Sequence, residues 1–152
     1  MLLVQIVFKM VSYIDSSVVL SIIFQEANLE NSVKIWKKSE IRVSSILLEA
    51  ECKISIKRTF LNNRRKLGQT WKERKLIELD SLLEEINLKN LDSSTIENLN
   101  KEDTLSGCRT LDALHLSTAI EIQKELGEDL FIFSYDKEFI KVAKQLGFSF
   151  SE

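Results

Sequence analysis

The sequence predicts one α/β domain, a three-layer α/β/α sandwich with a mostly parallel central sheet. Apolar strand patterns alternate with amphipathic helical patterns along the chain, which is the order typical of parallel α/β folds. The 152 residues are enough to build one substantial core. Proline is absent and glycine occurs only four times, which favours helices with short connections over a sandwich of tightly turning strands.

The first part of the chain contains two predicted strands and four predicted helices. Residues 5–14 are apolar and β-branched, which predicts a buried strand that ends at Asp15. Ser16 and Ser17 are candidate N-caps for a helix over residues 18–26. The same patterns predict a helix at 31–38, a strand at 42–44, a helix at 45–60, a polar turn at 62–69 and an amphipathic helix at 71–86.

The second part of the chain repeats this alternation. Its predicted elements are a strand at 86–88, a polar helix at 93–103, a helix at 108–126 closed by Gly127, a strand at 130–134, a helix from 136 or 137 to 146 closed by Gly147, and a strand at 148–150. Asp15 and Asp136 each follow a clear buried strand. Functional sites of parallel sheets form outside the carboxyl ends of the strands, so both acids are candidate site residues.

A single domain is predicted to span residues 1–152. Residues 1–9 are interpreted as an N-terminal extension of the first strand, because the segment lacks the basic region and cleavage site of a signal peptide. Met10 is also a plausible start, because the strand pattern is complete without the residues before it. No stretch approaches the roughly 18 apolar residues of a membrane span. Cys52 and Cys108 fall in predicted helices without a CxxC partner, which indicates reduced, buried thiols in a cytoplasmic protein.

The net charge of -2 conceals a strong segregation of charge. Residues 53–75 contain nine basic residues and one acid, and residues 76–103 contain eight acids and two lysines. A basic block of this density can attract a polyanion, and Arg64, Arg65 and Lys66 lie at its centre. A solvated helix surface would show the same pattern. Only the nearby Glu51 makes a nucleic-acid contact a competitive interpretation.

Four carboxylates stand where an acid is costly: Asp15, Glu51, Asp112 and Asp136. The first and last end apolar strands, and the other two lie on apolar stripes of predicted helices. A carboxylate beside a core requires compensation of its charge, and several together repel one another. A divalent cation such as Mg²⁺ or Mn²⁺ prefers oxygen ligands and would relieve both costs. The pattern therefore indicates metal-assisted chemistry on a phosphodiester.

Each of these acids also has a purely structural interpretation. Asp15 and Asp136 could be helix N-caps. Asp112 lies in a helix that is largely apolar, and Arg109, three residues earlier, could be its partner in place of a metal.

Glu51 could be a surface residue paired with Lys53 or Lys57, and spacing alone does not separate it from Glu49. His115, the only histidine, could ligate a metal or shuttle a proton. A lone histidine among leucines is more often a packed, hydrogen-bonded core residue.

Four motifs follow one another in a fixed order. They are Tyr-Ile-Asp-Ser-Ser at 13–17, Val-Ser-Ser-Ile-Leu-Leu-Glu-Ala-Glu at 43–51, Arg-Thr-Leu-Asp-Ala-Leu-His-Leu-Ser-Thr-Ala at 109–119, and Phe-Ser-Tyr-Asp at 133–136. Together they resemble the PIN-domain ribonucleases, most closely the VapC-type toxins of type II toxin–antitoxin modules, over roughly residues 13–150. Ser134 stands where threonine is common in that family, and Ser117 where alanine is common. Neither departure removes an acid.

The resemblance implies a PIN-like fold in which the four acids converge on one or two Mg²⁺ or Mn²⁺ ions. It implies Asp15, Asp112 and Asp136 as the metal ligands, with Glu51 completing the shell or orienting the attacking water. By the same resemblance, Ser17, Thr110 and Ser134 are candidates to hold the carboxylates in place, and Arg109 and the basic block are candidates to contact RNA.

The implied function is that of a metal-dependent endoribonuclease acting as a toxin, which forms a homodimer and is silenced by a cognate antitoxin. The predicted apolar helices at 18–26 and 71–86 offer surfaces for such a partner. Two alternatives remain open. One is a PIN nuclease in RNA processing without an antitoxin, and the other is a non-catalytic α/β interaction module whose acids serve as caps and surface charges.

Overall fold

Five parallel strands form one sheet at the centre of the protein, as a computed structural model that describes residues 9–151 shows. The strands are β1 (Val11–Ile14), β2 (Ile41–Ser45), β3 (Asn87–Lys89), β4 (Phe131–Phe133) and β5 (Ser149–Phe150). Their order in the sheet is β3-β2-β1-β4-β5, and each neighbouring pair is parallel. The predicted α/β class is therefore confirmed, and the sheet is parallel throughout its described strands.

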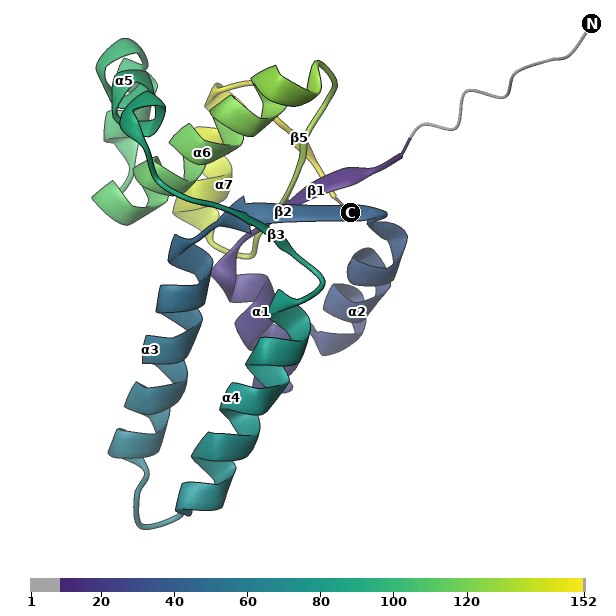
Figure 1. The fold of residues 1–152 in the computed structure, drawn as a ribbon, viewed down its shortest axis with the longest axis vertical. Coiled ribbons are helices and arrows are strands. Elements are labelled where there is room, and N and C mark those ends of the chain that lie inside the picture. Colours follow the sequence, from purple (N-terminus) through teal and green to yellow (C-terminus); the bar gives the residue numbers. More distant parts are fainter. Residues whose placement is uncertain (1–8, 152) are drawn as a thin grey trace, which may run out of the picture.

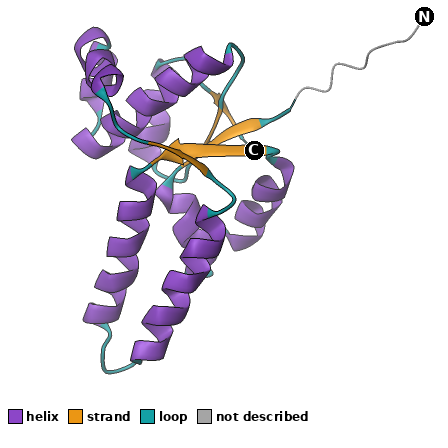
Figure 2. Cartoon of the chain, viewed as in Figure 1, coloured by secondary structure: helices purple, strands orange, loops and turns teal. Residues whose placement is uncertain are grey.

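Helices cover both faces of this sheet (Figures 1 and 2). One layer holds α1 (Ser16–Ile23), α2 (Leu29–Lys38), α3 (Leu47–Asn62) and α4 (Gln69–Leu83). The other holds α5 (Ser93–Lys101), the 3₁₀ helix η1 (Asp103–Gly107), α6 (Thr110–Leu126) and α7 (Lys137–Gln145). The long helices α3 and α4 run side by side and project away from the sheet as a hairpin (Figure 1). No helix of the described residues is long and apolar enough to cross a lipid bilayer.

Each face of the sheet carries its own apolar core, because successive side chains of a strand point to opposite faces. Tyr13 packs with Leu116 and its neighbours beneath α6 and α7. The next residue, Ile14, packs with Leu48 of α3 and Leu79 of α4 on the opposite face. All four residues of β1 are buried, and this strand contributes side chains to both cores.

The structure changes several predicted boundaries. Strand β1 begins at Val11, and residues 5–8 of the predicted strand lie outside the described residues. The first helix begins at Ser16, so Ser16 and Ser17 are helical residues and Asp15 occupies the N-cap position. This helix ends at Ile23 instead of residue 26, because Gln25 has a φ of 50° that an α-helix does not accommodate.

Two further predictions from the sequence require correction. Cys108 is only half-buried and lies between η1 and α6, whereas Cys52 is buried within α3 as predicted. The fourth helix covers Gln69–Leu83, so the polar turn at 62–69 is shorter than expected and the strand β3 begins one residue later.

The strand order reverses between β1 and β4. From β1 the chain builds the sheet outward through β2 and β3, and β4 then returns to the other side of β1. Ligand sites of open parallel sheets form at such a reversal, outside the carboxyl ends of the two strands. Ile14 is paired with Phe133, and the backbone N–H of Asp15 donates to the carbonyl of Phe133 at 3.0 Å. The two strands therefore end side by side.

Candidate active site

Asp15 is held by two serine hydroxyls at the end of β1. Ser17 and Ser134 both donate to its Oδ2 atom, each at 2.7 Å. Although only 5% of Asp15 is exposed, its carboxylate makes no cap hydrogen bond to α1. The two serines accept backbone N–H groups in turn, Ser17 from Tyr135 and Ser134 from Asp136. The loop after β4 is thereby tied to Asp15, and the N-cap interpretation of this side chain is not supported.

Asp136 divides its two oxygens between separate partners. Oδ1 accepts the backbone N–H groups of Glu138 and Phe139 at 2.9 and 3.1 Å, which makes this residue the N-cap of α7. Oδ2 lies 3.4 Å from Nη2 of Arg109. One oxygen therefore caps the helix, and the other faces Arg109.

Asp112 lies in the first turn of α6 and is 7% exposed. Burial raises the pKa of this carboxyl, the neighbouring Arg109 guanidinium opposes the shift, and the charges of Asp136 and Asp15 add to it. Arg109 bridges Asp112 and Asp136, with its Nε 3.3 Å from Oδ2 of Asp112. Three carboxylates from distant parts of the sequence thus share one electrostatic environment.

Glu51 faces the same region from α3, and Glu49 does not. The Oε1 atom of Glu51 lies 2.5 Å from Nε2 of His115, and Ser16 donates to its Oε2 at 3.4 Å. Glu49 instead pairs with Lys53 at 2.6 Å. The structure thereby separates two glutamates that the sequence left equivalent.

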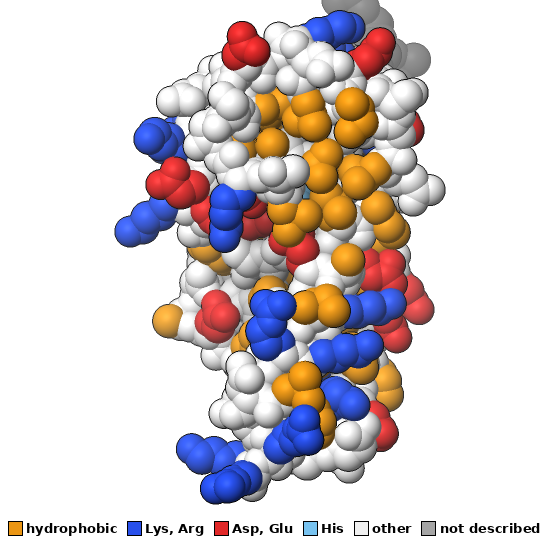
Figure 3. All heavy atoms as spheres, turned by 90° about the vertical axis from the view of Figure 1, so that its left-hand side faces the viewer, with side chains coloured by type: hydrophobic (Ala, Val, Ile, Leu, Met, Phe, Trp, Pro, Cys, Tyr) orange, Lys and Arg blue, Asp and Glu red, His pale blue; other side chains and the backbone are white. Residues whose placement is uncertain are grey.

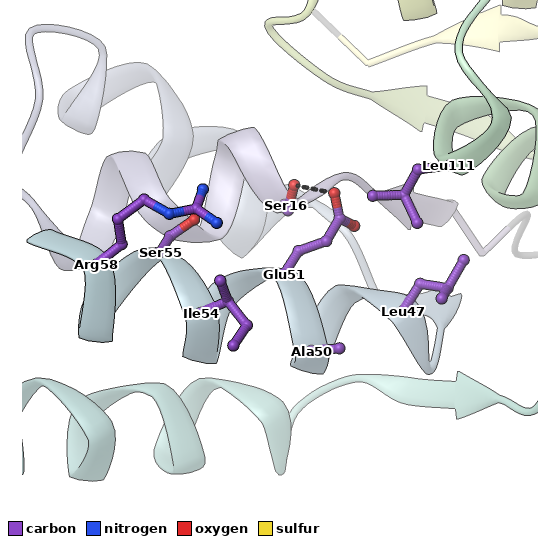
Figure 4. Close-up of a pocket in the computed structure, with 8 residues that line it drawn as sticks. All are labelled: Ser16, Leu47, Ala50, Glu51, Ile54, Ser55, Arg58 and Leu111. Carbon is purple, nitrogen blue, oxygen red and sulfur yellow. Dashed lines mark hydrogen bonds between the residues drawn. The ribbon is translucent and has the colours of Figure 1, made fainter.

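A hollow of about 370 Å³ adjoins Glu51 (Figure 4). Leu47, Ile54 and Leu111 provide apolar parts of its lining, and Arg58 brings a guanidinium to it from α3. Arg58 was not among the predicted site residues. Its spacing from Glu51 could have identified it from sequence, because residues 51 and 58 are two turns apart and lie on one face of a helix.

The remaining predicted residues lie apart from the carboxylates. Thr110 is exposed, and within residues 9–151 its hydroxyl makes no hydrogen bond to any of the four acids. Arg64, Arg65 and Lys66 lie in the loop that joins α3 and α4, at the far end of the hairpin from the sheet. A helix rises about 1.5 Å per residue, so the end of α3 is about 16 Å along its axis from Glu51. In the view of Figure 3, Lys and Arg side chains gather over the lower half of the molecule.

The oxygen atoms of three acids suit a hard divalent cation. Asp15, Asp112 and Asp136 supply carboxylate oxygens, the ligand type that Mg²⁺ and Mn²⁺ prefer. The raised pKa of Asp112, which burial causes and the two neighbouring carboxylates increase, indicates excess negative charge that a cation would offset. As the side chains stand in the described part of the chain, no three acidic, histidine or cysteine residues enclose a metal-sized space. Arg109 lies between two of the acids, and its side chain is 79% exposed.

Comparisons with known proteins agree with this architecture. No curated protein matches the chain in a sequence comparison. One solved structure with a similar fold is that of VapBC2 from Rickettsia felis bound to a DNA fragment from their promoter. The superposition has a TM-score of 0.61 and 15% sequence identity, and it covers 88% of this chain and 93% of that chain. The profile of the PIN domain matches residues 12–145, nearly the whole described region. The chain therefore belongs to the PIN domain family.

Proposed function

We propose that this protein is a metal-dependent endoribonuclease that cleaves RNA phosphodiester bonds as the toxin of a toxin–antitoxin pair. The proposal is supported by two links among the acids of a PIN domain: Arg109 bridges Asp112 and Asp136, and Ser134 joins Asp15 to the loop before Asp136. The similarity to the VapBC2 structure supports an antitoxin as the partner. A cytoplasmic location and a homodimer belong to the same proposal.

In this proposal Asp15, Asp112 and Asp136 hold Mg²⁺ or Mn²⁺, directly or through water. Such an ion supplies a bound water of lowered pKa and stabilises charge that develops on the phosphate. Ser17 and Ser134 fix Oδ2 of Asp15, which leaves Oδ1 for the cation.

The remaining side chains have roles around the phosphodiester. Glu51 orients the attacking water, and Arg109, which pairs with Asp112 and Asp136, would contact the phosphate. Arg58 lies between Glu51 and the hairpin tip and, in this arrangement, contacts the RNA backbone.

The two glutamates of α3 provide a matched test of this assignment. The wild type should cleave RNA with Mg²⁺ or Mn²⁺ and stop when EDTA is added. Asp15→Asn, Asp112→Asn and Glu51→Gln should each lose at least about 100-fold in kcat, because each removes part of the charge that binds the ion or directs the water. Glu49→Gln makes the same change elsewhere on the helix and should retain wild-type activity, since Glu49 pairs with Lys53.

Cleavage is measured on a labelled RNA by gel electrophoresis. Activity that persists unchanged in both Asp15→Asn and Asp112→Asn would originate from a contaminant and would refute the assignment. Loss of activity in Glu49→Gln equal to that in Glu51→Gln would refute the role of Glu51.

A second experiment separates the toxin from the alternatives. Expression of the chain in bacteria should arrest growth, and co-expression of a small gene adjacent to its own should restore growth. Cleavage of RNA without such a gene would favour a processing nuclease. A protein that binds partners and never cleaves RNA would favour the non-catalytic interaction module.

A further inference from the structure

A row of polar groups leads from the interior of the protein to Glu51. The hydroxyl of Tyr13, on β1, lies 2.8 Å from Nδ1 of His115, on α6. The other ring nitrogen of His115 lies 2.5 Å from Oε1 of Glu51, on α3. Tyr13 and His115 are fully buried. His115, in the helix layer that contains α6, therefore contacts Glu51, in the helix layer that contains α3, beyond the end of β1.

The hydrogen-bond partners fix where the protons lie. A tyrosine hydroxyl has an ordinary pKa of about 10 and is therefore protonated at neutral pH. The hydroxyl of Tyr13 lies 2.8 Å from Nδ1 of His115, and the side chain of Ser44 and the backbone of Ser45 lie close to the same oxygen. Ser44 donates its own hydroxyl to the carbonyl of Ile14 and Ser45 offers a backbone N–H, so we assign the buried O–H of Tyr13 as the donor to Nδ1. A neutral imidazole that accepts at Nδ1 carries its proton on Nε2, and that N–H donates to the Glu51 carboxylate.

Packing holds the imidazole in this orientation. The rings of Tyr13 and Phe139 lie edge-on to that of His115, at centroid distances of 6.0 and 6.4 Å. A glutamate on a helix surface would otherwise sample several rotamers, and ordering it costs conformational entropy. The hydrogen bond from His115 offsets this entropy loss, because it restricts the rotamers of Glu51 before RNA binds. It engages Oε1 and leaves Oε2 on the side of Ser16 (Figure 4).

We propose that His115 is a positioning residue, which holds Glu51 through an Nε2–H hydrogen bond while Tyr13 fixes the tautomer of the ring. This inference rests on the proposed function, in which Glu51 orients the attacking water. His115 contacts neither the RNA nor a cation in this role. In this role His115 is both a buried, hydrogen-bonded residue and a functional one.

Steady-state kinetics of the full chain test the role. His115→Leu should lower kcat by about 10- to 100-fold, the range seen when the partner of a functional side chain is removed, and should leave KM for RNA unchanged. His115→Gln keeps an N–H donor at similar reach and should restore part of the loss. Tyr13→Phe should give a smaller loss in kcat, because the ring remains and only the group that fixes its tautomer is gone.

Thr118→Val is the matched control for these variants. Thr118 is buried on the same helix and its hydroxyl donates to the carbonyl of Leu114, so the variant also loses a hydrogen bond within α6. Among the described residues Thr118 makes no hydrogen bond to Glu51, so Thr118→Val should keep the wild-type kcat. Equal losses in Thr118→Val and His115→Leu would show that α6 is merely destabilised, and the proposal would be wrong.

Nitrogen-15 NMR of the imidazole supplies a readout that does not depend on catalysis. His115 is the only histidine, so its ring signals need no assignment. The Nε2–H tautomer is expected, with a proton signal that shifts in Glu51→Gln. An Nδ1–H tautomer would overturn the proposal.

The outcomes for the two proposals differ. If the wild type cleaves RNA and His115→Leu has an unchanged kcat, only the positioning role is refuted. If the wild type cleaves no RNA with Mg²⁺ or Mn²⁺, the proposed function fails, and the positioning role fails with it even where NMR shows the hydrogen bond.

Discussion

Asp136 shows that a single side chain can serve a helix and a site at once. Its Oδ1 caps α7 and its Oδ2 faces Arg109. An acid directly after a strand can be a helix N-cap or a site residue, and the sequence pattern alone does not separate these two interpretations. Asp15 has the same position relative to its strand, yet Ser17 and Ser134 occupy its Oδ2 and no cap bond forms. The difference lies in contacts between distant residues, which local patterns do not contain.

Asp112 should weaken the metal-free fold. Burial raises its pKa above the usual carboxyl value, and the charges of Asp136 and Asp15 add to this, so the folded protein binds that proton more tightly than the unfolded chain. Stability therefore falls as pH rises through this pKa. In EDTA at neutral pH, Asp112→Asn should have a Tm equal to or above that of the wild type. Its advantage should shrink as pH falls through the raised pKa of Asp112 and should be gone below the usual carboxyl pKa.

Thermal unfolding followed by circular dichroism measures this difference. Asp129→Asn changes an exposed acid and serves as the control, with no expected pH-dependent gain. A Tm of Asp112→Asn clearly below that of the wild type at neutral pH would show that the bond from Arg109 outweighs burial and repulsion.

The α3–α4 hairpin is the element whose orientation the sequence did not reveal. Leucines at helical spacing predicted both helices, because period 3.6 marks which face is apolar. The pattern does not say what that face packs against. In the structure, Leu79 is the buried residue of α4. Trp71 stacks on Phe24, which directly follows α1, and Lys75 donates to the carbonyl of Ile23. These contacts hold α4 against the neighbouring helices along most of its length, and residues 63–68 of the tip stay clear of both cores.

Neutralising the hairpin tip should weaken RNA binding without affecting the chemistry. The triple variant Arg64→Gln, Arg65→Gln and Lys66→Gln should raise the Kd for RNA and give a shallower dependence of binding on salt, by about 0.7 in log–log slope for each phosphate that the tip no longer neutralises. The kcat should stay near the wild-type value, since the tip is about 16 Å along α3 from Glu51. Fluorescence anisotropy at several salt concentrations measures the slope.

The exposed lysines of α2 provide a control of equal charge. Lys34, Lys37 and Lys38 lie on a helix outside the hairpin, and changing all three to glutamine removes the same three charges. If both triple variants reduce the slope equally, the effect is one of net charge, and the tip has no special contact with RNA.

At the scale of the whole molecule, the sheet joins two cores that face away from each other. The alternation of strands and helices allowed the fold class and the ends of β1 and β4 to be predicted from sequence, and with them the meeting of Asp15 and Asp136. The link from His115 to Glu51 could not be predicted, because it joins helices of opposite layers around a strand end. Such a contact depends on the thickness and twist of the assembled layers, which no local pattern records.

The two cores should unfold together because β1 contributes to both. Leu116→Ala removes a buried side chain from one core and Leu48→Ala from the other, each at a cost of about 2–5 kcal/mol. Both tryptophans, Trp36 and Trp71, lie in the layer that contains Leu48. In denaturant titrations, Leu116→Ala should nevertheless shift the tryptophan fluorescence and the circular dichroism midpoints equally. Separate midpoints would show that the layers unfold independently.

The clear tip of the hairpin has a consequence for how such a protein can diversify. Residues 63–68 contribute nothing to either core, so their replacement or lengthening carries little penalty in folding. In the proposed ribonuclease, the tip that contacts RNA can therefore change in sequence or length while the acids near the ends of β1 and β4 stay the same.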